Sequence, residues 1–470
     1  MSTSPSRGAT VHDLVGIGFG PSNLALAIAI EEHNRAAPQH ALDAVFLERQ
    51  ERFGWHRGML LDGATMQVSF LKDLVTMRDP ASRFSFLSYL SERGRLADFI
   101  NRKSLFPFRI EFHDYLEWAA DHVAHLVRYD AEVTDVAPVR GESGVDALEV
   151  VVGGQDGELA QVHRARNVAI AAGIRPSLPS NCTPTGRIWH NHDLLARLAE
   201  LPPGEPKRFV VVGAGQSAAE TTEYLHRHFP GCEVCAVFSR YGYSPSDDTA
   251  FANRIFDPEA VDHFFQAPDD VKRRLLEYHR NTNYSVVDPE LIDDLYRRTY
   301  QERVRGEQRL RMLNACHVVE VQDFADCVRA VVEFLPTGER RELHADALVY
   351  ATGYEPVDPL QLLGATAAYC QRTPDGVVAV ERDYRVATTE DMRCGIYVQG
   401  ATEHSHGITS TLLSNTAVRV GEILSSVLAR TSPQQACPPP TSASRAAGPT
   451  PVPHRGGGPG RTAEATTDRR

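Results

Sequence analysis

Residues 13–23 read DLVGIGFGPSN, an apolar run that ends in a turn with three glycines. An apolar helical pattern follows, and a second apolar run at residues 44–47 ends in an acidic residue. A strand, a glycine turn, a helix and a second strand in this order are typical of the βαβ unit that binds a dinucleotide. We therefore expect a nucleotide-binding βαβ fold near the start of the chain.

The glycine spacing of this first unit is close to G-x-G-x-x-G but not identical to it. Gly18 and Gly20 occupy the first two glycine positions, and Asn23 occupies the third. Glycines there let the turn tighten and the backbone approach a pyrophosphate, which lies at the positive end of the helix. Glu48, at the end of the second strand, is placed to bind ribose hydroxyls. On this unit alone, a glycine-rich turn in another kind of α/β protein remains an alternative.

A second unit of the same kind begins about 200 residues later. Residues 208–218 read RFVVVGAGQSA, with small residues in the G-x-G-x-x-A pattern at Gly213, Gly215 and Ala218. The second strand of this unit is followed by Arg240 rather than by an acid. A guanidinium holds a 2′-phosphate that a carboxylate would repel, so this site is predicted to prefer NADPH over NADH. The alternative is that Arg240 is a solvated loop charge.

Two dinucleotide units in one chain favour a flavoprotein that is reduced by a nicotinamide nucleotide. Two further apolar runs, at residues 169–176 and 347–356, each end in a glycine turn and a proline. We expect these turns to carry the chain between the two nucleotide-binding domains. The predicted fold class is α/β, with two Rossmann-like dinucleotide-binding domains, for FAD and NADPH, plus a small, mostly helical substrate region.

Shifts in composition predict how the chain is divided. Residues 201–206 are rich in proline and mark one boundary. The last segment is rich in Pro, Gly, Ala and Thr and cannot bury enough apolar surface to fold. The two ends, at 1–10 and 432–470, are predicted to be disordered. The FAD-binding domain is predicted in two parts, a first part at 11–200 and a return at 356–431 that ends in a last helix over 412–429. Between these parts lies the predicted NADPH-binding domain at 205–355, with a helical substrate insertion at about 245–311.

Composition excludes several classes of protein. The chain has 470 residues with 49 Lys or Arg and 61 Asp or Glu, so its formal net charge is −12. Such a chain has no general attraction to nucleic acid or to an anionic membrane surface. It shows no signal peptide and no run long enough to span a membrane, so we expect a cytoplasmic protein. Cys232 and Cys235 form a C-x-x-C without a second pair to complete a zinc site, so we expect no metal.

Several segments together carry a resemblance to a known family. They are GFGPSNL at 18–24, FGWHRGM at 53–59, MQVSFLKDL at 66–74, GQSAAE at 215–220, PSDD at 245–248, NTNYS at 281–285, ATGY at 351–354 and HG at 406–407. With these segments the chain resembles the flavin-dependent N-hydroxylating monooxygenases, specifically the L-ornithine N5-monooxygenases of siderophore and other hydroxamate biosynthesis. The similar segments span residue 11 to about residue 424, nearly the whole predicted folded part.

The resemblance implies a reaction. NADPH reduces FAD, O2 adds to give a C4a-hydroperoxyflavin, and this transfers an oxygen atom to the neutral side-chain amine of L-ornithine, giving N5-hydroxyornithine. Because the cofactor carries the chemistry, neither a nucleophilic triad nor a metal is needed. In this family NADP+ stays bound during the reaction. The resemblance also implies a homo-oligomer, of which a homotetramer is one form, whereas the net charge of −12 predicts no nucleic-acid or membrane partner.

The resemblance also implies the site residues, position by position. FAD would be bound by Gly18, Gly20, Pro21, Ser22, Glu48, Trp55, His56, Gln67, Val133, Thr411, Leu412 and Leu413. NADPH would be bound by Gly213, Ala214, Gly215, Gln216, Ser217, Arg240, Asn283, Tyr284 and Ser285. L-ornithine would be bound by Lys72, which pairs with its carboxylate, and by Asn253, Arg254, Ile255, Phe256 and Ser414. Catalysis would rest on the flavin, with Gln67 and Asn283 in support.

Taken alone, several of these residue types also fit other roles. Lys72 fits a surface lysine whose stem covers apolar neighbours. Asn253 and Asn283 fit helix caps. His404 and His406 are spaced like metal ligands, but without a third ligand they also fit loop histidines.

Alternative functions remain open on the sequence. An L-lysine N6-hydroxylase or a diamine N-hydroxylase uses the same chemistry, and one methylene is worth only about 1–3 kcal/mol in a pocket. Lys72 argues against a diamine, which has no carboxylate. A flavin disulfide reductase would need Cys232 and Cys235 as its dithiol, yet residues three apart on a strand face opposite sides of the sheet. A non-enzymatic flavin-binding sensor is the remaining alternative.

Overall fold

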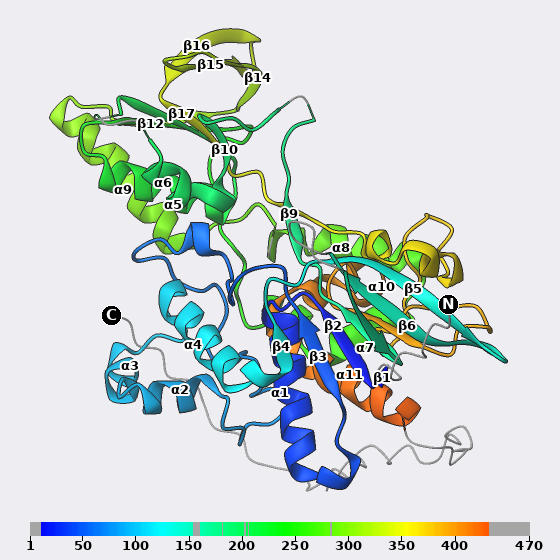
Figure 1. Cartoon of the computed structure of the whole chain (residues 1–470). Helices are drawn as coiled ribbons and strands as arrows, with labels where there is room; N and C mark the ends of the chain where they lie inside the picture. Colours follow the sequence, from blue (N-terminus) through cyan, green and yellow to red (C-terminus); the bar gives the residue numbers. More distant parts are fainter. Residues whose placement is uncertain are drawn as a thin grey trace, which may run out of the picture. The chain divides into compact units, whose positions relative to one another are not determined.

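The computed structural model describes residues 11–153, 160–180, 182–201, 204, 206–282 and 284–431. Within these residues the fold is mixed α/β and contains two five-stranded parallel sheets (Figure 1). The predicted disordered ends, residues 1–10 and 432–470, lie outside the described residues, as does Asn283.

The first sheet contains the first glycine turn. Its strand order is β19-β8-β2-β3-β4, and every neighbouring pair is parallel. The strands are β2 (Leu14–Ile17), β3 (Ala44–Leu47), β4 (Val127–Arg128), β8 (Asn167–Ile170) and β19 (Gly395–Val398). Both faces are covered, so the central strands are buried throughout and, apart from Asn167 at the start of β8, lack polar side chains, as is typical of parallel sheets.

Helices pack on one face of the first parallel sheet, and a four-stranded covering sheet packs on the other face. Leu14 and Phe46 share a core cluster with the helices, whereas Val15 and Val45 share one with the covering sheet. The helices are α1 (Pro21–Ala36), α2 (Phe86–Glu92), α3 (Leu96–Arg102), α4 (Arg109–His122) and α11 (Thr416–Thr431). The covering sheet has the order β1-β7-β6-β5 and consists of β1 (Val11–His12), β5 (Val133–Gly141), β6 (Gly144–Val152) and β7 (Gln161–Ala165).

The second parallel sheet contains the second glycine turn and repeats this plan. Its order is β10-β17-β11-β12-β13, with strands β10 (Ile188–His190), β11 (Arg208–Val212), β12 (Glu233–Phe238), β13 (Leu310–Asn314) and β17 (Ala347–Tyr350). One face packs on α5 (Leu194–Ala199), α6 (Gln216–His228) and α9 (Pro289–Arg305). The other face packs on an antiparallel sheet of β14 (Cys316–Asp323), β15 (Val328–Phe334) and β16 (Glu339–Ala345) (Figure 1).

The two predicted crossings between the sheets pair with each other. After β8 the chain forms β9 (Ile174–Pro176), and after β17 it forms β18 (Tyr354–Pro356). These two short strands are antiparallel partners, with Tyr354 opposite Pro176. The chain then returns to the edge of the first sheet as β19. Two α/β parts joined by a double crossing match the predicted fold class, whereas the exact domain boundaries remain a prediction.

The segment predicted to be a helical insertion contains α7 (Pro258–Gln266), α8 (Asp269–Tyr278) and α9. The short helix α10 (Glu403–His406) lies further along the chain. The last helix was predicted over 412–429 and begins four residues later, at Thr416. The backbone of Leu412 is extended, with φ −100° and ψ 160°, and residues 413–415 form a separate 3-10 turn, η10 (Leu413–Asn415), so the α-helix cannot start earlier.

Candidate functional site

The first glycine turn has the geometry that close backbone approach requires. Gly18 follows β2 with φ +79°, and a Cβ there would lie 2.5 Å from the carbonyl oxygen of Ala171. Gly20 caps α1, which begins at Pro21 and carries no acidic residue in its first turn. A Cβ at Gly20 would meet no atom within 4 Å, so the space at this helix N-terminus is open. A helix N-terminus with free space and no acidic residue in its own first turn fits an anionic phosphate group.

Asn23 explains the imperfect third glycine position. It is fully buried, and its Nδ2 donates to the carbonyl oxygens of Ile17 at 3.2 Å, Gly18 at 2.7 Å and Ala169 at 3.2 Å. Its Oδ1 accepts a 2.7 Å hydrogen bond from Nε2 of Gln399. One amide thus ties together the ends of β2, β8 and β19, which glycine could not do.

Glu48 lies at the end of β3, as predicted, and is buried. Its Oε2 accepts a 2.6 Å hydrogen bond from the backbone N–H of Phe19, inside the first turn. Its Oε1 accepts one from the backbone N–H of Gln50 at 3.0 Å. Val133, at the start of β5, is close along the chain to Ala131, whose N–H donates to the Glu48 carbonyl at 2.8 Å. The structure therefore brings Glu48 to the first turn, with the strand of Val133 alongside.

A buried arginine joins Ser22, which follows the first glycine turn, to Ser410, which precedes the predicted FAD residues Thr411–Leu413. Arg419 is on α11 and is 1% exposed. Its guanidinium donates to the side-chain oxygen of Ser22 at 3.0 Å and also to the carbonyl oxygen of Ser410. Burial lowers the pKa of this guanidinium. Sequence reasoning missed Arg419, although a charged residue among the apolar positions of an amphipathic helix was a visible signal.

The other predicted FAD residues lie on the loop between β3 and α2. Trp55 packs its ring 6.2 Å from that of Phe112, and His56 adopts a left-handed conformation with φ +50°. Burial lowers the pKa of His56 to about 4, so its ring is neutral at pH 7. Gln67 is exposed.

The second glycine turn is equally tight. Gly213 has φ +152°, and a Cβ there would lie 2.3 Å from the carbonyl oxygen of Ala351. Ala214 follows, and Gly215 caps α6, whose first turn begins with Gln216 and Ser217 and holds no acidic residue. This turn also fits a phosphate group.

The loop at residues 284–288 lies against the second turn. The Cα of Ser285 lies 3.5 Å from where a Cβ of Gly215 would be. Arg240 donates from Nη1 to the carbonyl oxygen of Ser285 at 2.9 Å and to the hydroxyl of Ser244 at 3.2 Å. Tyr284 donates its hydroxyl to Glu403 on α10. The structure therefore brings together Arg240, Ser285 and the second turn.

The predicted substrate residues come from three segments, of which two meet. The Nζ of Lys72 lies 5.4 Å from the ring centre of Phe256, at the end of the 3-10 helix η5 (Ala252–Phe256). Burial lowers the pKa of the Lys72 amine, and Asp257 opposes this shift. Asn253 donates to the carbonyl oxygen of Asp248 at 2.6 Å, a contact within its own loop.

A cavity of about 390 Å³ lies beside η5. Arg254 and Ile255 line it, together with Ile408 and Thr409 of the 3-10 helix η9 (Ile408–Thr411). Ser414 follows on η10 and is buried. The cavity connects the predicted substrate segment with the segment that leads into Thr411–Leu413.

The two cysteines of the C-x-x-C motif lie on opposite sides of the second parallel sheet. Cys232 packs in the core cluster with α6, and Cys235 packs in the cluster with β14–β16. Burial raises the pKa of both thiols to about 12. A dithiol that closes a disulfide requires the two side chains on one side, so this geometry argues against a disulfide reductase.

His404 and His406 are engaged by the protein itself. His404 bonds from Nε2 to the carbonyl oxygen of Val378 at 2.9 Å, and His406 stacks on Tyr384 with ring centres 4.1 Å apart. Among the described residues, no three His, Cys, Asp or Glu side chains gather as metal ligands.

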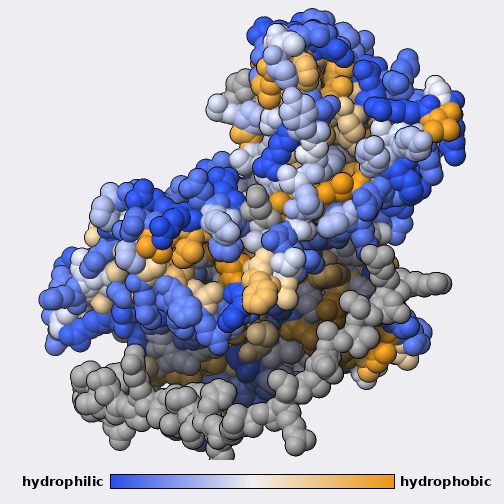
Figure 2. Space-filling view, turned by 180° about the vertical axis from the view of Figure 1, so that it is seen from behind, coloured by the Kyte–Doolittle hydropathy of each residue, from blue (hydrophilic) through white to orange (hydrophobic). Residues whose placement is uncertain are grey.

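In the part of the chain that the structure describes, no helix has both the length and the apolar character needed to cross a membrane. On the face shown in Figure 2, hydrophilic residues cover most of the described surface and hydrophobic residues form separate patches.

Comparisons with known proteins agree with this geometry. Residues 10–356 match the family model described as L-lysine 6-monooxygenase/L-ornithine 5-monooxygenase. The L-ornithine N(5)-monooxygenase of Burkholderia cepacia is 43% identical over 408 residues, covering 85% of this chain and 90% of the relative. The solved ornithine N-hydroxylase of Kutzneria sp. 744, described with reduced FAD, NADP+ and L-ornithine, has 49% identity and a TM-score of 0.86, covering 90% of this chain and 100% of that one. The L-lysine 6-monooxygenase structure from Pseudomonas syringae has 32% identity and a TM-score of 0.78, with the same coverage.

Proposed function

We propose that this chain, which belongs to the L-lysine 6-monooxygenase/L-ornithine 5-monooxygenase family, is an FAD-dependent L-ornithine N5-monooxygenase. The overall reaction is L-ornithine, O2, NADPH and a proton giving N5-hydroxyornithine, NADP+ and water. The observation that carries this proposal is the pair of tight glycine turns, one on each parallel sheet, in a chain 49% identical to an ornithine N-hydroxylase described with both cofactors and L-ornithine.

FAD fits the first turn. The open N-terminus of α1 would take the pyrophosphate, with Gly18, Gly20, Pro21 and Ser22 in contact. Glu48, whose two carboxylate oxygens each accept one backbone hydrogen bond, from Phe19 and from Gln50, keeps further acceptor sites for the ribose hydroxyls.

The flavin ring would lie between two further sets of residues. One set is on the loop before α2 and comprises Trp55, His56 and Gln67. The other is Thr411–Leu413, which directly follows Ser410, the residue that Arg419 ties to Ser22. Val133 would contact the adenine end. When bound, FAD supplies the redox and oxygen chemistry, taking electrons from NADPH and passing one atom of O2 to the amine.

NADPH fits the second turn. Gly213 to Ser217 would cradle its pyrophosphate at the N-terminus of α6. Arg240 would bind the 2′-phosphate, because the exposed guanidinium already lies at this turn and has further donors available. Tyr284 and Ser285 would contact the nicotinamide half, and so would Asn283.

L-ornithine would lie with its carboxylate on Lys72. The amine of Lys72 is half-buried beside Phe256, and among the described residues no carboxylate forms an ion pair with it. Asn253, Arg254 and Ile255 would hold the amino-acid end, and Ser414 would line the amine end. A site that fixes the carboxylate places the side-chain amine at a set distance, which favours one chain length.

L-lysine N6-hydroxylation is the second candidate, because the lysine monooxygenase of P. syringae shares the fold at 32% identity. We propose ornithine first because the two relatives with higher identity named above are both ornithine enzymes. The role in siderophore or other hydroxamate biosynthesis, a homo-oligomeric state such as a homotetramer and a cytoplasmic location are further parts of the proposal.

The test is a visible spectrum of the purified protein followed by NADPH oxidation with ornithine, lysine, putrescine or no addition. The proposal expects a bound-flavin spectrum and NADPH consumption that rises most with ornithine. Equal rates with all four would contradict it.

A further inference from the structure

A buried ion pair connects α6, which follows the second turn, to α4 beside the first sheet. The guanidinium of Arg109 faces the carboxylate of Glu220 in a two-pronged arrangement, with Nη1 2.8 Å from Oε2 and Nη2 2.7 Å from Oε1. The side chains are 12% and 6% exposed, so little water screens the pair. Such a fork fixes orientation as well as distance.

Arg109 also holds the loop at residues 59–67. Its Nη1 donates to the carbonyl oxygen of Met59 at 3.1 Å, and its Nη2 donates to that of Thr65 at 3.4 Å. Its backbone N–H donates to the carbonyl oxygen of Ala64 at 2.8 Å. The last residue of this loop is Gln67, one of the residues proposed to lie beside the flavin.

Glu220 extends the chain of contacts in the other direction. Its Oε1 accepts a 3.0 Å hydrogen bond from Nε2 of Gln216, the first residue of α6. The Oε1 of Gln216 accepts a 2.8 Å hydrogen bond from the backbone N–H of Asp288. The 284–288 loop, which lies against the second turn, is therefore tied to Glu220 through one side chain.

We propose that Arg109, Glu220 and Gln216 form a positioning relay that holds the 59–67 loop and the 284–288 loop at a fixed separation, so that NADPH reduces FAD efficiently. This inference rests on the proposed function. Arg109 and Glu220 are positioning residues, because they act through the two loops. A displacement of about 1 Å between reacting groups costs up to about a hundredfold in rate, so a rigid relay is consequential.

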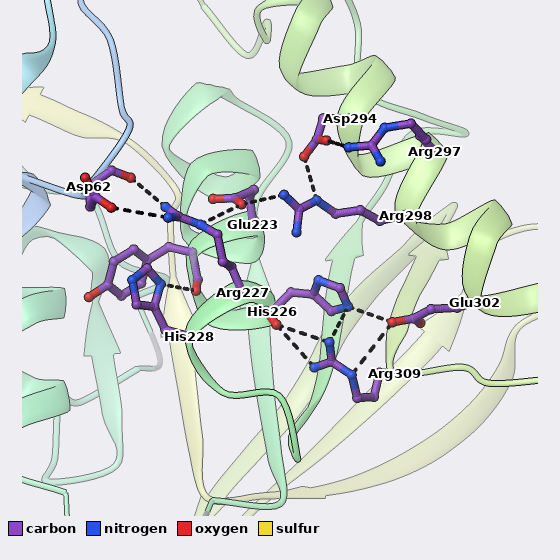
Figure 3. A network of polar contacts seen from close by, with 11 residues as sticks. Asp62, Glu223, His226, Arg227, His228, Asp294, Arg297, Arg298, Glu302 and Arg309 are labelled. Atoms are coloured by element: carbon purple, nitrogen blue, oxygen red, sulfur yellow. Dashed lines mark hydrogen bonds and ion pairs between the residues drawn. The ribbon is translucent and has the colours of Figure 1, made fainter. Parts of the chain in front are cut away.

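The structure offers a matched control on the same helix. Arg227 of α6 also reaches the 59–67 loop, with Nη1 3.3 Å from Oδ2 of Asp62 and Nη2 donating to the Asp62 carbonyl oxygen at 2.6 Å (Figure 3). These side chains are 35% and 77% exposed. Exposed ion pairs contribute little, so breaking this one leaves the loop in place.

The experiment compares Glu220→Gln, Gln216→Ala and Arg227→Gln holoenzymes with the unmutated one. Anaerobic stopped-flow mixing with NADPH gives the rate constant of flavin reduction separately from NADPH affinity. Hydrogen exchange gives the protection of the Asp288 amide without any turnover. Flavin content and melting temperature show whether each variant is folded.

We expect Glu220→Gln and Gln216→Ala to reduce the flavin about tenfold to a hundredfold more slowly, with faster exchange at Asp288. Arg227→Gln should match the unmutated enzyme in both readouts. Arg109→Lys keeps the charge but loses the fork, so its rate should fall between those of Glu220→Gln and the unmutated enzyme.

Two results overturn the relay. One is a Glu220→Gln enzyme with a lowered melting temperature but an unchanged rate constant of flavin reduction, which would mean a purely structural ion pair. The other is an unchanged Gln216→Ala enzyme, which would mean that the connection to Asp288 has no effect. If Glu220→Gln does not fold, Gln216→Ala decides the question alone. Failure of the unmutated protein to oxidise NADPH contradicts the proposed function instead, so the two failures are distinct.

Discussion

Replacing Lys72 by alanine tests the substrate site most sharply. A lysine amine bonded to a carboxylate contributes about 1.5–3 kcal/mol, which corresponds to about tenfold to 150-fold in binding. The Lys72 amine is only half-buried, so solvent screening places the expected effect at the lower end, about tenfold to thirtyfold in kcat/KM for L-ornithine. Flavin content should not change, because the first turn is untouched.

The control is Lys272→Ala. The Nζ of Lys272, on α8, lies 5.8 Å from the ring centre of Phe265, a contact of the same kind as that of Lys72 over Phe256. Steady-state NADPH oxidation and hydroxylated-amine formation should be unchanged in this variant. In Lys72→Ala, peroxide release per NADPH should rise because a misplaced amine leaves oxygen to escape as peroxide. Putrescine, which has no carboxylate, should be nearly indifferent to the substitution.

The reasoning about Lys72 is refuted by a Lys72→Ala enzyme that binds ornithine as tightly as the unmutated one. It is equally refuted by one that loses flavin and keeps its substrate affinity, since that would make Lys72 a structural residue.

Three further predictions follow from the geometry. Arg240→Ala should raise the KM for NADPH about tenfold or more while that for NADH changes less, because the proposed coenzyme contact of the guanidinium is the 2′-phosphate, which NADH lacks; equal changes for both coenzymes exclude this role. Asn23→Ala should lower the free energy of unfolding in urea by about 1–3 kcal/mol, because the buried amide of Gln399 loses its partner; an unchanged midpoint contradicts the strand-tying role. Burial lowers the pKa of His190 and His406 from 6.5 to about 4, so between these values the unfolded chain binds protons that the native one does not. These histidines do not affect stability above pH 6.5, but proton uptake by the unfolded chain destabilises the native state increasingly as the pH falls from 6.5 towards 4. The melting temperature should therefore drop between pH 6.5 and 5, and a constant value would show that these histidines titrate normally.

Local patterns predicted much of this fold. The two glycine turns, their helices and the two crossings are encoded in segments of about ten to thirty residues, and the structure has each of them. The two sheets that cover the parallel ones, one mixed and one antiparallel, were not predicted as sheets. Their pairing joins strands that periodicity alone cannot assign to partners, as when β1 pairs with β7 across about 150 residues.

The site was predictable only where one segment carries it. The turns around Gly18 and Gly213 are local, so spacing revealed them. Asn23 looked like a defect in the fingerprint because its partners lie on β8 and beyond β19, far away in sequence. The Arg109–Glu220 pair was missed for the same reason, since 111 residues separate its members. Long-range polar contacts leave no periodic signal in a single sequence.

The most direct test of the central claim is the fate of oxygen. The protein should be incubated with NADPH and ¹⁸O₂, with L-ornithine or L-lysine as substrate, and the products analysed by mass spectrometry. The account predicts one ¹⁸O atom on the N5 nitrogen of ornithine, close to one hydroxylated product per NADPH, and much less labelled lysine. NADPH consumption that yields only peroxide with ornithine, or labelled lysine formed in preference to labelled ornithine, would contradict it.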